Sequence, residues 1–219
     1  MKIVLFGATG MIGEAVLIEC LEDDSVETVL AVVRRPTGHG HPKLLELIHR
    51  DFLDYSGVEG RLAGYDACLY CLGVSSFGMS EADYRCITLD FTVAAAEVLL
   101  GLNPGMRVCF VSGAGAGAAG RAMWARVKAE AEQALLAMPW RSAHMFRPAF
   151  VMPRKGVVSR VRAYRVLYAL VGWAYPILGM LVPDRVTTSD HLARAMIRVA
   201  RDGHPRNVLE GSDINAVGG

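Results

Sequence analysis

Residues 7–13 read Gly7-Ala8-Thr9-Gly10-Met11-Ile12-Gly13, a G-x-x-G-x-x-G variant of the glycine fingerprint for dinucleotide binding. An apolar run, Lys2 to Phe6, precedes them, and Met11 to Leu21 has the spacing of a helix. We expect Gly7 to make a tight turn, Gly10 to let a pyrophosphate approach the backbone, and Gly13 to let helix and strand pack closely. A plain helix-capping turn is the alternative, but strand, glycine spacing and helix coincide here as the fingerprint requires.

The rest of the chain alternates between short apolar runs and segments with helical periodicity. The runs are nearly continuous, which is typical of parallel strands covered by helices on both faces. The expected strands are Lys2–Phe6, Thr28–Val33, Leu45–His49, Ala67–Leu72, Arg107–Val111, Ser142–Phe146 and a short strand near Val208, and the expected helices are Met11–Leu21, Glu81–Leu100, Arg121–Leu136 and Ser189–Ala200. This order predicts an α/β fold of the Rossmann type: a doubly wound parallel sheet with helices on both faces and ligands at the carboxyl ends of the strands.

The length and charge of the chain limit the number of domains and the classes of partner. The 219 residues fit one NAD(P)-binding Rossmann domain, 1–219, with a nucleotide-binding core, 1–153, and a small C-terminal extension, 154–219, on the substrate side. With 23 basic and 22 acidic side chains, the chain has no global field for a polyanion, and we expect no nucleic-acid partner.

The cysteines and histidines predict neither a redox centre nor a metal site. Cys68 and Cys71 spell C-x-x-C, but they lie in an expected strand, where residues three apart point to opposite faces. His39-Gly40-His41 has no third ligand nearby, so we expect a solvated loop and no metal. No signal peptide precedes the first expected strand, which indicates a cytoplasmic protein.

The end of the second expected strand carries the information on cofactor choice. An NAD-specific protein places a carboxylate there, whereas this chain has Arg34 and Arg35. A guanidinium binds a 2′-phosphate in bidentate fashion, so the pair favours NADP(H) over NAD(H), with a solvated arginine pair as the alternative. We also expect Asp51 and Phe52 beside the adenine, and Cys71-Leu72-Gly73 beside the ribose.

With these residues in hand, the chain resembles the atypical short-chain dehydrogenases and reductases, and most closely the branch of the Tat-interacting-protein oxidoreductase. The segments that carry the resemblance are Gly7 to Gly13, Arg34-Arg35, Cys71-Leu72-Gly73, Val111-Ser112, Val127-Lys128, Phe146-Arg147-Pro148 and Val208-Leu209-Glu210. The resemblance implies a Rossmann fold, NADPH binding that includes Lys128 and Pro148, and a Ser-Tyr-Lys active site with the spacing Y-x-x-x-K.

The expected active site is altered at its tyrosine. Lys128 matches the lysine, and Ser112 is the candidate serine, but Trp124 occupies the position four residues before Lys128. An indole N–H only donates a hydrogen bond and cannot exchange a proton as a phenol does. The usual serine is also in doubt, because related sequences often have Ser-Ser where this chain has Ser112-Gly113. A second G-x-G-x-x-G, Gly115 to Gly120, falls on the expected substrate side of the crevice.

Two functions therefore stay open: a weak oxidoreductase, or epimerase-like enzyme, on a small carbonyl substrate, and a catalytically silent NADP(H)-binding protein that regulates a protein partner.

The segment Val166–Val182 is uncharged and mostly apolar, and basic residues precede it from Arg154 on. Burial against the substrate cleft or in a homodimer is our expectation, and contact of residues 154–182 with a membrane surface is the alternative.

Overall fold

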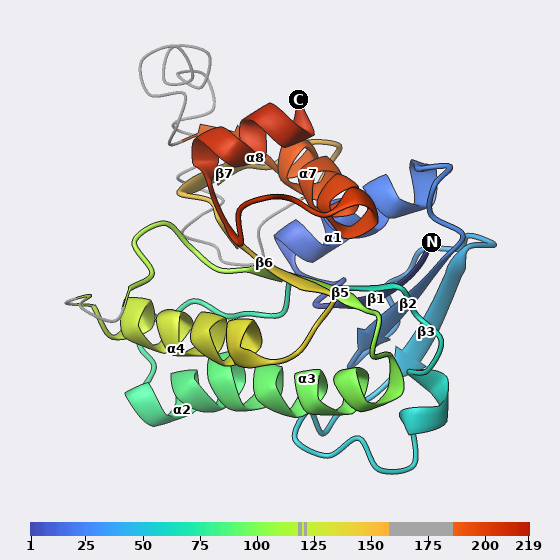
Figure 1. Ribbon diagram of the computed structural model, residues 1–219, viewed down its shortest axis with the longest axis horizontal. Coiled ribbons are helices and arrows are strands. Elements are labelled where there is room, and N and C mark those ends of the chain that lie inside the picture. The colour runs from blue at the N-terminus through green and yellow to red at the C-terminus, as the bar shows by residue number, and fades with distance from the viewer. Residues whose placement is uncertain (118–119, 121, 158–185) are drawn as a thin grey trace.

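The computed structural model describes residues 1–117, 120, 122–157 and 186–219. Within them, seven strands form one parallel sheet in the order β3-β2-β1-β4-β5-β6-β9 (Figure 1). The strands are β1 (Lys2–Phe6), β2 (Thr28–Val33), β3 (Leu44–Ile48), β4 (Ala67–Tyr70), β5 (Arg107–Val111), β6 (Ser142–Arg147) and β9 (Val208–Glu210). The strand order reverses between β1 and β4, which confirms the doubly wound Rossmann-type fold.

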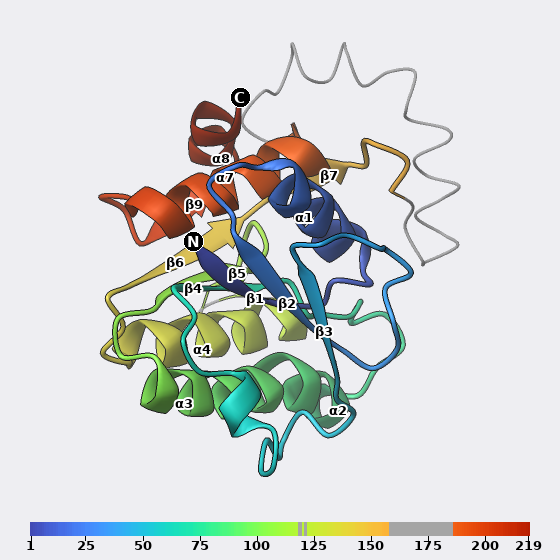
Figure 2. The same cartoon turned by 90° about the vertical axis from the view of Figure 1, so that its right-hand side faces the viewer.

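Helices cover both faces of this sheet, as Figures 1 and 2 show from two directions. One face carries α1 (Met11–Glu22), α7 (Ser189–Asp202) and α8 (Gly211–Gly218), and the other carries α2 (Glu81–Arg85), α3 (Phe91–Leu102) and α4 (Met123–Ala137). The central strands are buried on both sides. Ile3 and Leu5 belong to the core under α1 and α7, whereas Val4 and Phe6 belong to the core under α3. The continuous apolar runs follow from this double coverage.

The expected helix 81–100 is two helices joined by one π-helical turn, Cys86–Asp90. Ser80 begins it, because its hydroxyl accepts a hydrogen bond from the Asp83 amide at 3.1 Å. A short 3₁₀ helix, Glu59–Arg61, leads into β4. Neither the π turn nor the 3₁₀ helix was expected from periodicity, which cannot detect a single changed turn.

The C-terminal third adds to the core. β9 pairs with β6, so Phe146 is in register with Leu209, and α7 packs against α1 through Leu192, Met196 and Val199. A separate two-stranded parallel sheet, β7 (Phe150–Met152) with β8 (Val186–Thr188), was not expected. The Lys155 ammonium forms an ion pair with Glu19 of α1 at 2.6 Å, which ties the start of the extension to the core.

The apolar segment 166–182 lies outside the described residues. No helix in the part of the chain that the structure describes is long and apolar enough to cross a membrane.

Candidate cofactor and active site

The glycine turn has the geometry that a dinucleotide fingerprint needs. Gly7 has φ +80°, and its carbonyl accepts a hydrogen bond from the Gly10 amide at 2.9 Å. A Cβ on Gly7 would lie 2.6 Å from the backbone of Cys71, and one on Gly13 would lie 2.1 Å from the Gly7 oxygen. A Cβ on Gly10 would meet only that oxygen, at 3.4 Å. Gly7 and Gly13 therefore hold the turn against β4 and α1, while Gly10 has open space around it.

The first turn of α1 can receive an anion. Gly10 is its N-cap, and no side-chain hydrogen bond caps it among the described residues. The first amides of a helix lack intrahelical acceptors, and the helix dipole favours negative charge there. Ala8 is buried, and Met11 and Ile12 pack against the core under α1, so the backbone rather than these side chains faces a ligand. Thr9 is half-buried in the same turn.

Arg34 and Arg35 follow β2 directly and are exposed. The His49 amide donates to the Val33 carbonyl at 2.8 Å, so the ends of β2 and β3 lie side by side next to the pair. The loop that follows contacts both β3 and α1: the Thr37 hydroxyl donates to Glu46 of β3 at 2.6 Å, and His39 lies 3.8 Å from Glu14 of α1. Neither arginine has an ion pair among the described residues, so both guanidiniums are available at this edge.

Asp51 and Phe52 differ in what they offer an adenine. Asp51 is exposed, and one of its carboxylate oxygens accepts a hydrogen bond from the Leu53 amide at 3.0 Å. The Phe52 side chain is only 3% exposed and stacks on Phe91 with ring centroids 5.7 Å apart. Only the backbone of Phe52 is left for a base, since its ring belongs to the core.

Lys128 joins the ends of β4 and β5. Its ammonium donates to the Val111 carbonyl at 2.9 Å and lies 4.9 Å from the centroid of the Phe110 ring. A Cβ on Gly73 would lie 3.8 Å from the same nitrogen. Burial lowers the pKa of Lys128 to about 8, and the nearby Glu132 carboxylate opposes this shift. The lysine is thus placed between the segments expected beside the ribose and the substrate.

Cys71, next to this lysine, is not a reactive thiol. Burial raises its pKa to about 12, so it stays protonated at neutral pH. Cys68 and Cys71 are both free, and the described residues contain no group of His, Cys, Asp or Glu able to hold a metal. Leu72 packs against the core under α3, and Gly73 is exposed.

Trp124 lies over the loop between β5 and α4. A Cβ on Gly113 would come within 3.5 Å of its ring, and one on Gly115 within 3.9 Å. Ser112 is 8% exposed, and its hydroxyl oxygen is buried without a hydrogen-bond partner among the described residues. A buried hydroxyl in that state costs free energy unless a ligand satisfies it. Trp124 thus lies beside Ser112-Gly113 and one helical turn before Lys128. The tryptophan therefore occupies, in the structure as in the sequence, the position where the resemblance implies a tyrosine.

The loop is also tied to β6. The Ser112 amide donates to Phe146 at 2.7 Å, and the Ala114 amide donates to the Pro148 carbonyl at 3.0 Å. Behind Pro148, the Arg147 guanidinium binds the buried Glu132 carboxylate, with Nε donating at 2.9 Å. We did not expect this ion pair from the sequence, although Arg147 lies in one of the segments that carry the resemblance. It fixes α4 to β6 and so supports the helix that holds Trp124 and Lys128.

Solved structures with the same fold include proteins that hold NAD. MoeE5 in complex with UDP-glucuronic acid and NAD aligns with TM-score 0.70 and 18% identity over 95% of this chain and 74% of its own. The fold is that of the short-chain dehydrogenases and reductases. A short-chain dehydrogenase/reductase superfamily protein from Agrobacterium tumefaciens with bound NAD aligns with TM-score 0.68 and 12% identity over 99% of this chain and 81% of that one. The resemblance found in the sequence is thus confirmed at the level of the fold.

One sequence relative spans most of the chain. Protein FMP52, mitochondrial, from Eremothecium gossypii is 28% identical over 194 residues, which is 82% of this chain and 84% of that protein. No family model matches the chain.

Proposed function

We propose that the protein binds NADP(H) along the carboxyl ends of β2, β1, β4 and β5 and acts as a slow oxidoreductase on a small carbonyl substrate. A nicotinamide cofactor supplies a hydride when bound. The glycine turn would hold its pyrophosphate, Asp51 and the Phe52 backbone its adenine, and Cys71 to Gly73, Lys128 and Pro148 its nicotinamide half.

The preference for NADP(H) rests on one observation: Arg34 and Arg35 are exposed where a carboxylate would bind the ribose hydroxyls. Two guanidiniums that have no ion pair among the described residues favour the additional phosphate of NADP(H). The solved neighbours are described with NAD, so this preference is specific to the present chain's residues.

A catalytically silent NADP(H)-binding protein is the second candidate, and Trp124 favours it. In this proposal Ser112 would bind a substrate oxygen and Lys128 a ribose, yet Trp124 occupies the position where the resemblance implies a tyrosine phenol. Such a protein would act through a partner. A homodimer, or contact of residues 154–182 with a membrane surface, belongs to the same proposal. We keep a cytoplasmic location as a prediction, noting that the name of FMP52 places that relative in mitochondria.

Nucleotide titration tests the proposal. We expect the purified chain to bind NADPH at least about tenfold more tightly than NADH, a difference of about 1.4 kcal/mol. The variant Arg34→Gln should lose affinity for NADPH and leave affinity for NADH nearly unchanged, and Arg61→Gln, whose side chain binds the Glu46 carbonyl, is the matched control. Equal affinities of the wild type for the two cofactors would contradict the preference, and no binding of either would overturn the proposal.

A further inference from the structure

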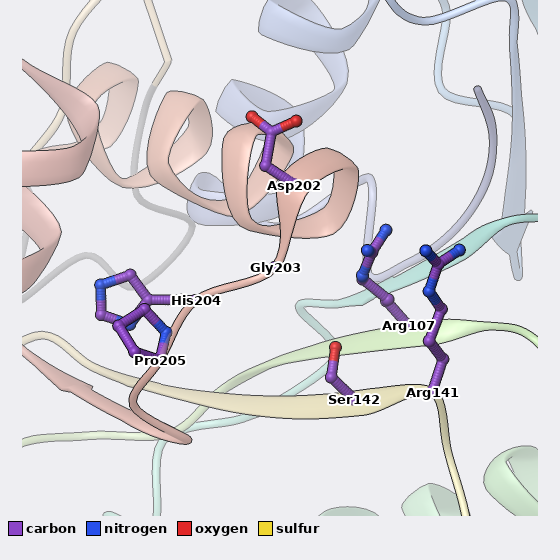
Figure 3. A pocket seen from close by; sticks show the side chains of 7 residues that line it. All are labelled: Arg107, Arg141, Ser142, Asp202, Gly203, His204 and Pro205. Atoms are coloured by element: carbon purple, nitrogen blue, oxygen red, sulfur yellow. The ribbon is translucent and has the colours of Figure 1, made fainter.

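A pocket of about 400 Å³ lies at the other edge of the sheet, where β5 and β6 begin and α7 ends. Figure 3 shows Arg107, Arg141 and Ser142 on its strand side, and Asp202 and His204 on the side of α7 and the segment that follows it. The glycine turn and Lys128 lie at the carboxyl ends of the strands, so this pocket is separate from the proposed cofactor site.

Two guanidiniums give the pocket its charge. The Arg107 Nη1 donates to the Arg201 carbonyl at 2.8 Å at the end of α7, while its Nε lies 3.6 Å from the position that a Cβ on Gly203 would take. Arg141 is exposed, and its side chain has no hydrogen bond or ion pair among the described residues. The negative charge of Asp202 is balanced by the Arg201 guanidinium, which binds it at 2.8 Å. The lining is therefore positive in balance.

A buried histidine, His144, determines the direction in which the Ser142 hydroxyl donates its hydrogen bond. His144 is 1% exposed, with Nδ1 3.1 Å from the Arg206 carbonyl and Nε2 3.0 Å from the Ser142 oxygen. A carbonyl cannot donate, so Nδ1 carries the hydrogen and Nε2 of the neutral ring accepts one from Ser142. The Ser142 hydroxyl therefore donates its hydrogen to His144, and its oxygen can only accept a hydrogen bond from a ligand in the pocket.

His204 is placed differently. Its Nδ1 lies 3.1 Å from the Arg206 amide, which can donate to it, and 3.3 Å from the Arg206 carbonyl, to which it can donate. The pocket thus combines N–H donors from Arg107 and Arg141 with the Ser142 oxygen as an acceptor, while the Asp202 carboxylate in the same lining is bound by Arg201. Donors match the oxygens of an anion, whereas the acceptor needs a ligand that also carries a hydrogen to donate.

We propose that this pocket binds a small oxyanion that carries a hydroxyl, with its charged oxygens on Arg107 and Arg141 and its hydroxyl donating to Ser142. Hydrogen phosphate, a singly protonated phosphate monoester and a 2-hydroxycarboxylate share this chemistry. Sulfate has the same shape as phosphate but no proton at neutral pH, so it would leave the Ser142 acceptor facing a negative oxygen. The proposal is independent of whether the chain binds NADP(H).

The experiment titrates inorganic phosphate and sulfate at equal ionic strength into ¹⁵N-labelled full-length protein near neutral pH. We expect phosphate to shift the backbone amides of Ser142 and Gly203 with an affinity at least about fivefold above that of sulfate. Shifts in residues 10–13 would report phosphate at the glycine turn and are scored separately. Methyl phosphate, and lactate against propionate, then distinguish a phosphate ligand from a hydroxycarboxylate.

Three variants make the result specific. Arg141→Gln should weaken phosphate binding about tenfold, and Arg50→Gln, an exposed arginine after β3, should not change it. Ser142→Ala should remove the preference for phosphate over sulfate, and Ser142→Thr, which keeps the hydroxyl on the strand, should retain it. Equal shifts by phosphate and sulfate in the wild type, or phosphate affinity unchanged in Arg141→Gln, would overturn the proposal.

Discussion

Gly10 and Gly13 lie one helical turn apart, yet side chains added to them have different consequences. A Cβ on Gly10 has room, whereas one on Gly13 would overlap the Gly7 carbonyl. We therefore predict that Gly10→Val folds and loses at least about tenfold in NADPH affinity, because its side chain fills the approach to the first amides of α1. Thermal unfolding and cofactor titration of the same sample measure both parts.

The control for this prediction is Gly13→Ala, which adds one methyl group and should fail to fold or lose much of its stability. A folded Gly10→Val protein that binds NADPH as tightly as the wild type would remove the glycine turn as the cofactor site.

The Lys128 ammonium costs stability at neutral pH. Its pKa is lowered from 10.5 to about 8 by burial, so the folded chain releases this proton more readily than the unfolded chain. Below pH 8 both states hold the proton and the cost is constant, and between pH 8 and 10.5 the cost disappears as pH rises. The unfolding free energy of the wild type should therefore rise in this window by about 1 to 3 kcal/mol relative to Lys128→Met.

Urea denaturation of both proteins at several pH values measures this difference. Lys128→Arg, which stays charged throughout, should follow Lys128→Met in its pH dependence. Parallel curves for the wild type and Lys128→Met between these pH values would contradict a lowered pKa.

The proposed catalysis depends on the helix α4 and the loop before it. Trp124 packs on Gly113 and lies one turn before Lys128, so Trp124→Tyr places a phenol beside an ammonium that can lower its pKa. We predict at most weak reductase activity in the wild type, in line with a slow oxidoreductase, and a gain of about 10² or more in carbonyl reduction for Trp124→Tyr. NADPH oxidation with a panel of small aldehydes, quinones and ketones measures it.

The double variant Trp124→Tyr with Gly113→Ser is the fuller test, because it also supplies the serine that related sequences often have. Wild-type turnover of about 1 s⁻¹ or more would contradict the prediction. Loss of an existing activity in Trp124→Tyr would show that Trp124 belongs to a different working site.

Elements with a strong repeating pattern were predictable from the sequence. β1, β2 and β5 have the expected bounds, and the glycine turn and Lys128 lie at the expected edge, because buried parallel strands and a glycine fingerprint leave a local pattern. The π turn at Cys86–Asp90 left none, since one wider turn hardly changes helical periodicity. The burial of Phe52 depends on contacts between distant segments, which a single sequence does not contain. The same holds for the Ser112 hydroxyl, which is buried without a hydrogen-bond partner in the part of the chain that the structure describes.

The described residues after 153 add a strand and helices to the common core. β9 extends the main sheet beyond β6, and α7 covers the same face as α1. The single domain over 1–219 and its division at residue 153 both stay predictions. α7 was predictable because its buried residues recur at helical spacing, from Leu192 through Met196 to Ala200.

The core of the whole molecule also contains four cysteines whose ionisation opposes folding, namely Cys20, Cys68, Cys71 and Cys109. Burial raises the pKa of each above its ordinary value of 9.0. An unfolded chain loses these protons as pH rises past that value while the folded chain keeps them, so the stability present below it is lost as pH rises. We predict that the unfolding free energy falls above about pH 9, by up to about 1.4 kcal/mol per pH unit for each thiol.

The variant Cys109→Ala tests this prediction. It should be less stable than the wild type near neutral pH, because it leaves a small cavity. Above about pH 9, its unfolding free energy should fall less steeply with pH than that of the wild type, by the contribution of one thiol. Denaturation under reducing conditions measures both slopes, and equal slopes would show that Cys109 ionises as readily in the folded chain as in the unfolded one.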